Sequence, residues 1–281
     1  MTPTGRKTKG VFDSHRHIGA LPAHPFYGGP AIRADVTAKE TVEGFFADLD
    51  REGTERALVL PNYGVPVPDA AFDLNPLAVE AAHKDDRVSC GLWVSPKASD
   101  AARNDEALKL VGQSGVKALK TSFLLGGHPT DPDCADEIDK IFTTAAQHDL
   151  VVHVHTSPGA ASDIDQVGTL VDRYGDDTKI HLVHLGGGMS GHMKLIGGRL
   201  FDWIEAGKQV YTDTSWTIGF APVWLVQEIE RRGGAGHDRI LFATDCPWGD
   251  FEGEHARLSA VAKDPELFEA FFRGNFERLY G

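Results

Sequence analysis

The sequence predicts an α/β fold, a (β/α)₈ TIM barrel formed as a single domain over residues 1–281. Two observations lead to this prediction. Short apolar segments alternate with longer amphipathic ones about eight times along the chain, the pattern of strand–helix units with a parallel sheet. The length of 281 residues is also close to the roughly 250 residues of one such barrel. A doubly wound open sheet is the alternative, but no GxGxxG motif follows the first predicted strand.

Most of the eight predicted strands are near-continuous runs of Val, Ile, Leu and Ala, as expected for strands that are covered on both faces. They span residues 11–18, 56–62, 87–96, 115–122, 150–157, 179–186, 209–216 and 238–248. The intervening segments are helical candidates. Eight strand–helix units in this length favour closure of the sheet into a barrel.

Composition narrows the class of function. The formal net charge of −13 lacks the basic footprint that nucleic-acid binding requires. No apolar run approaches the roughly 20 residues that span a bilayer, and no apolar segment follows the basic first ten residues as in a signal peptide. The cysteines Cys90, Cys134 and Cys246 are odd in number and far apart, which indicates a reducing compartment. We expect a cytoplasmic protein with a small-molecule substrate and neither a nucleic-acid nor a membrane partner.

The oligomeric state stays open at this point. Helices on the outside of a barrel often pair, so a homodimer is one possibility. The apolar and aromatic stretch from Leu267 to Tyr280 could pack on a neighbouring chain or on its own barrel, and we favour its own barrel.

Polar residues gather where the predicted strands end, the face on which barrel enzymes build their sites. Asp13, His15 and His17 alternate along the first strand, so their side chains share one face. Two imidazoles one pleat apart can hold one metal ion, although an isolated HxH is more often a structural coincidence. Comparable residues close the fifth, sixth and eighth strands: His153, His155, His181, His184 and Asp245. Buried ionisable residues are uncommon unless they are paired or bind a metal, so the combination predicts a metal site.

Five segments carry a resemblance to a known family: DSHRH (13–17), VHVHTSPG (152–159), LVHLGGG (182–188), FATDCPWGD (242–250) and GNFERLYG (274–281). With them the sequence resembles the amidohydrolase superfamily, in its amidohydrolase-2 branch. The resemblance implies that His15, His17 and His155 bind the metal. It also implies that Asp245 contacts the metal and takes a proton from its water, and that His184 polarises the substrate or activates water.

Two further residues depart from a simple mononuclear site. Lys120 lies near the end of the fourth strand, where binuclear relatives carry a carbamylated lysine that bridges two metals. The alternative is that Lys120 contacts a substrate anion or an acidic neighbour. His153 shares the strand parity of His155 but lies one pleat deeper, which suggests a partner that supports the ligands.

The resulting hypothesis is hydrolysis of an amide, a lactone or a related C–N or C–O bond by a metal-activated water, with Asp245 and His184 as catalytic residues. One divalent ion is expected, with Zn²⁺ preferred and Mn²⁺, Fe²⁺ or Co²⁺ as alternatives. The chief alternative is non-oxidative decarboxylation of a small aromatic or unsaturated acid. Such relatives tend to be longer, so the compact chain favours hydrolysis. A metal-free lactonase and a non-catalytic binding barrel are further alternatives.

Polar and aromatic side chains near the strand ends are candidates for substrate binding, although aromatic residues there more often serve in packing. The candidates are Trp93, Asp213, Trp216, His192 and Trp248.

Overall fold

The computed structural model of the chain describes residues 10–19, 41–62 and 70–281. Eight parallel strands form one sheet in the order β1 to β8, and each strand pairs with the next along the chain. The strands are β1 Val11–Ile18, β2 Thr54–Pro61, β3 Val88–Trp93, β4 Val116–Thr121, β5 Val151–Val154, β6 Lys179–Leu182, β7 Val210–Asp213 and β8 Ile240–Leu241. The predicted fold is confirmed, because this is a single α/β domain with the architecture of a TIM barrel.

Backbone hydrogen bonds bring β1 against the segment that follows β8. The amides of Ser14 and His17 donate to the carbonyl oxygens of Phe242 and Cys246, at 3.0 and 2.8 Å. In the other direction the amide of Asp245 donates to the carbonyl oxygen of His15 at 2.8 Å. The two ends of the sheet therefore meet at the very residues that the sequence assigns to the metal site.

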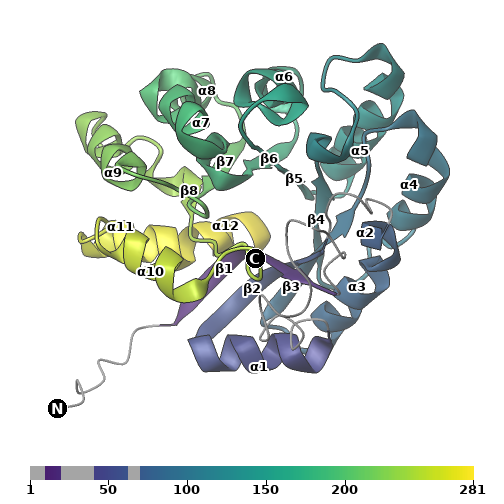
Figure 1. Cartoon of the computed structure of the whole chain (residues 1–281), viewed down its shortest axis with the longest axis horizontal. Helices are drawn as coiled ribbons and strands as arrows, with labels where there is room; N and C mark the ends of the chain where they lie inside the picture. Colours follow the sequence, from purple (N-terminus) through teal and green to yellow (C-terminus); the bar gives the residue numbers. More distant parts are fainter. Residues whose placement is uncertain (1–9, 20–40, 63–69) are drawn as a thin grey trace.

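Helices surround the strands (Figure 1). They are α1 Val42–Glu52, α2 Ala70–Asp73, α3 Asn75–Lys84, α4 Ala101–Leu108, α5 Ala135–Gln147, α6 Ile164–Tyr174, α7 Gly188–Lys194, α8 Leu200–Glu205, α9 Ala221–Arg231, α10 Phe251–Ser259, α11 Pro265–Glu269 and α12 Asn275–Tyr280. Helix α1 shows how the sequence sets such boundaries. The Thr41 side chain accepts a hydrogen bond from the Gly44 amide at its start, and Gly53 ends it at φ 70°.

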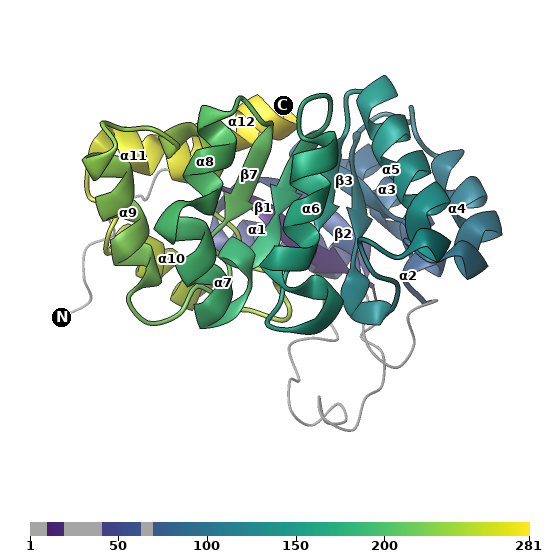
Figure 2. The same ribbon diagram turned by 90° about the horizontal axis from the view of Figure 1, so that it is seen from above.

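Helix α12 covers one end of the barrel, and Figure 2 places it and the C-terminus opposite α7. Its apolar side chains join those of six strands in a buried cluster inside the barrel, which we call the apolar end. The cluster consists of Phe12, Leu58, Leu60, Ala118, Val151, Tyr211, Leu241, Phe276, Leu279 and Tyr280. The C-terminal stretch therefore packs on its own barrel, as predicted.

Several predicted strands extend beyond the observed ones. The largest difference is at the eighth strand, predicted over 238–248 and observed as Ile240–Leu241. The chain leaves the ladder because the amide of Phe242 donates to the carbonyl oxygen of Phe271 instead, and Asp245 then adopts a positive φ. His155, His184 and Trp216 likewise lie beyond the last residue of their strands. Apolar composition predicts the strands, but it does not show where the backbone turns to present a side chain.

Three other expectations concern the chain as a whole. Cys90, Cys134 and Cys246 are buried and form no disulfide. Among the described residues, no helix combines the length and the apolar character that crossing a membrane requires. The homodimer and the cytoplasmic location stay predictions.

Candidate metal centre

Three side chains with metal-binding atoms meet at the carboxyl end of β1 and the segment after β8. The Nε2 atoms of His15 and His17 lie 3.0 Å apart, and each lies 3.0 Å from Oδ1 of Asp245. All three side chains are buried. Zinc bonds to His nitrogen and carboxylate oxygen are about 2.0–2.2 Å long, so atoms this close together can share one ion. The structure thus brings together three of the four predicted metal ligands.

The hydrogen-bond partner of His17 tests whether these atoms fit a cation. Its Nδ1 lies 3.0 Å from the carbonyl oxygen of Pro61, which can only accept, so Nδ1 carries the proton. In the neutral ring the lone pair is then on Nε2, which faces Asp245 Oδ1, another acceptor. Two buried acceptors at 3.0 Å repel each other unless a proton or a metal ion lies between them. A divalent ion would satisfy both atoms and His15 as well, so the residues fit the predicted metal.

The protonation states at the centre suit metal binding. Burial alone would raise the pKa of Asp245, but the nearby imidazoles of His15, His184 and His17 outweigh this effect and lower it. Burial lowers the pKa of His15 to about 3, so its ring is neutral near pH 7. Neutral imidazole and ionised carboxylate are the forms that bind metal ions.

The backbone at the centre adopts conformations that are rare for side chains of this size. His184, Trp216 and Asp245 have φ values of 61°, 56° and 54°. This left-handed region costs a non-glycine residue on the order of 1–3 kcal/mol, and it persists only where surrounding contacts hold it. Such conformations concentrate at functional sites, which supports a functional role for this end of the barrel.

His184 and His155 lie beside the three-residue centre. The His184 ring centroid is 5.2 Å from that of His15 and 5.1 Å from that of His155. Its Nε2 lies 3.9 Å from Oδ2 of Asp245. Among the described residues, two groups of three have possible ligand atoms close together, His15–His17–Asp245 and His15–His153–Asp213, and His155 belongs to neither. Its role as the fourth ligand stays a prediction.

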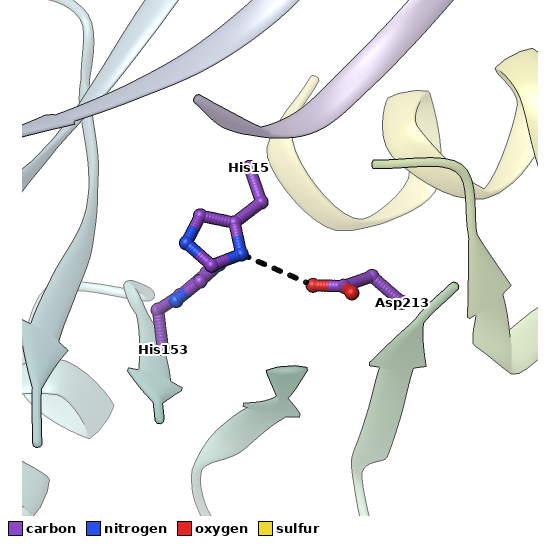
Figure 3. Close-up of side chains that lie close together, drawn as sticks. All are labelled: His15, His153 and Asp213. Carbon is purple, nitrogen blue, oxygen red and sulfur yellow. Dashed lines mark ion pairs between the residues drawn. The ribbon is translucent and has the colours of Figure 1, made fainter. Parts of the chain in front are cut away.

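A second group of buried side chains lies at the other edge of the His15 ring (Figure 3). His15 Nδ1 is 3.4 Å from Oδ2 of Asp213, and His181 Nε2 is 3.1 Å from the same oxygen. The His153 ring centroid is 4.6 Å from that of His15. Burial alone would raise the pKa of Asp213, but its contacts with His15 and His181 hold the pKa well below the usual range. Asp213, expected as a substrate contact, is fully buried behind His15.

Lys120 belongs to this second group. Its Nζ lies 3.1 Å from Nδ1 of His153, and the strand register places Lys120, His153 and His181 side by side on β4, β5 and β6. Burial lowers the pKa of Lys120 to about 7. Carbamylation of Lys120, like its contact with a substrate anion, stays a prediction.

Trp216 is placed differently from the other predicted substrate contacts. Its Nε1 donates to Oδ2 of Asp245 at 2.6 Å, while 47% of the residue is exposed. Trp93 is buried at the end of β3, 2% exposed. Trp248 is half-buried, and its amide donates to the carbonyl oxygen of Asp245 at 2.8 Å. Trp216 thus combines contact with the centre and an open surface.

His192 is buried within α7 and is engaged by backbone on both sides of its ring. Nδ1 donates to the carbonyl oxygen of Leu185 at 2.9 Å, and Nε2 accepts from the amide of Ile218 at 3.4 Å. The first bond ties α7 to the segment that follows β6, and the second ties it to the loop between β7 and α9. The geometry favours a structural role for His192 over the predicted contact with substrate.

Two residues of the site were not singled out by the sequence reasoning. The Tyr280 hydroxyl lies 2.6 Å from Nδ1 of His181, so the last helix reaches the group of buried polar side chains behind His15. The Thr244 hydroxyl donates to Oδ2 of Asp13 at 2.6 Å, and its amide donates to Oδ1. Thr244 directly precedes Asp245, which is a local signal. No local signal exists for Tyr280, because its partner is 99 residues away.

Comparison with known proteins places this geometry in context. The profile of the amidohydrolase family matches residues 12–281. A search of curated proteins found no match. Three solved structures illustrate the similarity in fold.

The first is a 2,6-dihydroxybenzoate decarboxylase in complex with 2,6-dihydroxybenzoate. It has a TM-score of 0.71 and 16% identity, over 97% of this chain and 99% of that one. A dihydroxybenzoic acid decarboxylase from a Polaromonas species, with manganese and 2-nitroresorcinol bound, has a TM-score of 0.70 and 15% identity over 97% of each chain. A zinc-bound amidohydrolase from Burkholderia multivorans has a TM-score of 0.69 and 14% identity, over 96% of this chain and 99% of that one.

Proposed function

We propose a function for this chain from one established premise: the chain belongs to the amidohydrolase family. We infer a metal-dependent enzyme in which His15, His17 and Asp245 hold one divalent ion, with His155 as the fourth ligand. Mn²⁺ and Zn²⁺ are the leading candidates, because similar structures hold these ions and because imidazole and carboxylate ligands suit both. When bound, the ion would act as a Lewis acid that orients substrate oxygen atoms and withdraws negative charge from them.

The reaction that we propose is non-oxidative decarboxylation of a small aromatic acid. The observation that carries this choice is Trp216, which is 47% exposed and whose indole Nε1 donates to Asp245. A flat apolar ring beside a charged centre suits a substrate that has both an aromatic ring and a carboxylate. Two similar decarboxylase structures hold small aromatic ligands. This chain covers 99% and 97% of their lengths, so a compact chain no longer favours hydrolysis over decarboxylation.

In this reaction the bond between the ring and the carboxylate breaks, CO₂ leaves, and the ring carbon takes a proton. We assign this proton transfer to His184: its Nε2, which faces Oδ2 of Asp245 at 3.9 Å, would take up a proton from solvent and pass it to the ring carbon. Asp245 is already engaged at both oxygens: Oδ1 lies in the metal centre, and Oδ2 accepts the indole N–H of Trp216. We therefore assign Asp245 to metal binding and Trp216 to its orientation.

Hydrolysis of an amide or a lactone is the second candidate. The similarity to a zinc-bound amidohydrolase supports it. In that reaction Asp245 would accept a proton from the attacking water, and His184 would stabilise the developing oxyanion.

The test begins with elemental analysis of protein purified without added metal, followed by assays for CO₂ release from hydroxybenzoates and for cleavage of lactones and amides. We expect about one Mn²⁺ or Zn²⁺ per chain and equal amounts of CO₂ and decarboxylated phenol. Hydrolysis without CO₂ would establish the second candidate instead. Protein that lacks metal and does not rebind it would overturn the metal centre and leave a metal-free lactonase or a binding barrel.

His17→Ala tests the assignment of the ligands. Loss of a residue that only supports a ligand weakens metal affinity about 10- to 100-fold, so loss of a ligand should weaken it by more than about 100-fold. His83→Ala, which removes an exposed histidine on α3, is the matched control and should bind metal as the wild type does. Equal affinity in the two variants would remove His17 from the site.

A further inference from the structure

We propose that Asp213 is the positioning residue of the metal centre, because one buried carboxylate fixes which nitrogen of His15 and of His184 carries the proton. The inference rests on the proposed metal site and adds to it a residue that does not touch the ion. Each imidazole must present a bare Nε2 to the centre, either to bind metal or to accept a proton. A neutral imidazole in isolation distributes its proton between both nitrogens, so a partner at Nδ1 is needed.

For His15 the partner at Nδ1 is Asp213, through an ion-pair contact that lacks the geometry of a regular hydrogen bond. Oδ2 of the carboxylate lies 3.4 Å from His15 Nδ1, and both side chains are fully buried. An ionised carboxylate can only accept, so the proton of the neutral ring belongs on Nδ1. The lone pair is then on Nε2, which lies 3.0 Å from the metal-binding atoms of His17 and Asp245.

His184 obtains its partner through Ser215. The Ser215 hydroxyl donates to Oδ1 of Asp213 at 2.5 Å, which uses its single proton. The same hydroxyl oxygen lies 2.8 Å from Nδ1 of His184 and must accept from it. Nε2 of His184 is therefore bare on the side that faces Asp245.

Asp213 also holds the strained backbone of His184. Its Oδ1 accepts from the His184 amide at 3.0 Å and from the Ser215 amide at 3.0 Å. The first of these bonds anchors the residue whose φ is 61°. Both the backbone conformation of His184 and the tautomer of its ring thus depend on the same oxygen atom, Oδ1 of Asp213.

A residue of the neighbouring strand β6 also contacts the carboxylate. His181 Nε2 lies 3.1 Å from Asp213 Oδ2, and the Tyr280 hydroxyl lies 2.6 Å from His181 Nδ1. If Tyr280 donates, His181 carries its proton on Nε2 and directs it at Asp213. All of these side chains are fully buried, so water does not compete for these ion-pair and hydrogen-bond contacts.

Asp213→Asn tests the proposal with a side chain of the same shape that cannot accept at both positions. We expect the folded variant to bind Co²⁺ about 10- to 100-fold more weakly, with an altered visible spectrum of the bound ion. Thr212→Val is the matched control: Thr212 is also fully buried on β7, but no contact ties its hydroxyl to the site. Wild-type affinity and an unchanged spectrum in Asp213→Asn would overturn the proposal. A second ion bound by His15, His153 and Asp213 would also overturn it, because Asp213 would then be a ligand.

A measurement on the metal-free wild type keeps the proposal testable if Asp213→Asn does not fold. Nitrogen-15 NMR of the imidazole rings near pH 7.5 should show His15 and His184 as Nδ1–H tautomers before any metal is added. An Nε2–H tautomer at either residue would contradict the proposal. Because this result does not depend on metal binding or turnover, it can fail while the proposed function stands, and the reverse also holds.

Discussion

The two ends of the barrel interior are built on opposite principles. The apolar end beneath α12 buries Phe12, Leu241 and Phe276 among other apolar side chains, together with the mainly apolar rings of Tyr211 and Tyr280. The end at the carboxyl termini of the strands buries imidazoles, carboxylates and a lysine at similar depth. Burying ionisable groups is costly unless they are paired or bind metal, whereas burying apolar surface is favourable. The apolar end therefore stabilises the fold, whereas burial of ionisable groups at the polar end lowers the free energy of unfolding.

The distribution of backbone strain agrees with this division. His184, Leu185, Trp216 and Asp245 have positive φ values at the polar end, and none of the ten residues of the apolar end does. A strained conformation survives only where the surrounding structure is firm enough to hold it. The side chains that stabilise the barrel by packing are therefore separate from the side chains that form the candidate site.

Phe276→Ala should separate the two ends most clearly. The ring of Phe276 is 1% exposed in the apolar end and packs edge-on against Phe12, with centroids 5.7 Å apart. Its removal leaves a cavity, so we expect the free energy of unfolding to fall by about 3–5 kcal/mol in denaturant titration. The metal affinity of the folded variant should stay within about threefold of wild type, a difference below 0.7 kcal/mol.

Phe220→Ala is the control for this experiment, because Phe220 is 54% exposed. We expect its free energy of unfolding to change by less than about 0.5 kcal/mol. A large loss of metal affinity in folded Phe276→Ala would contradict the separation of packing from chemistry.

A smaller effect on the free energy of unfolding is expected from Glu254, whose carboxylate is buried at the polar end. The carboxylate accepts from the amide of Trp216 at 3.2 Å and from Arg257 at 2.7 Å. Burial raises its pKa to about 7, against an ordinary value of 4.5, although Arg257 opposes the shift. Between these two values the unfolded chain loses the proton while the folded chain keeps it. The Glu254 contribution to stability therefore falls as the pH rises from about 4.5 to about 7, by at most about 3 kcal/mol.

Glu254→Gln isolates this effect, because the amide does not titrate. The free energy of unfolding of the variant minus that of the wild type should increase between pH 5 and pH 8 in denaturant titrations. Other titrating groups, including the buried Asp13, whose pKa burial raises to about 6, contribute equally to both proteins. A difference that does not change with pH would show that Glu254 ionises normally in the fold.

The sequence predicts the fold and the convergence of His15, His17 and Asp245 for a physical reason, while their role as metal ligands is what the family resemblance implies. Apolar runs identify eight strands, and a period of two places His15 and His17 on one face of β1. The barrel topology then brings Asp245, more than 200 residues away, to the same point. The convergence of these side chains needs only the composition and the order of the strands.

The sequence does not predict where the strands stop or what lies behind the ligands. His184 and Asp245 leave their strands through left-handed backbone, which only a few per cent of non-glycine residues adopt and which a histidine or an aspartate alone does not announce. Asp213 is read from the sequence as a substrate contact because it ends a strand, but its side chain is enclosed by His15, His181 and Ser215. Such an enclosure depends on side-chain packing across several strands, which periodicity does not encode.

Tyr280→Phe is the mildest change and addresses the place where the two ends meet. Tyr280 packs its ring within the apolar end, while its hydroxyl contacts His181, one of the buried polar side chains behind His15. Burial raises the pKa of Tyr280 well above its ordinary value, so the hydroxyl keeps its proton and can donate it. Phenylalanine preserves the packing and leaves only Nδ1 of His181 without a partner, so we expect a loss of about 1–2 kcal/mol in the free energy of unfolding. Metal affinity should fall less than in Asp213→Asn, because His181 still reaches the carboxylate. An unchanged stability together with wild-type metal affinity would show that the two ends are independent and that the hydroxyl merely fills space.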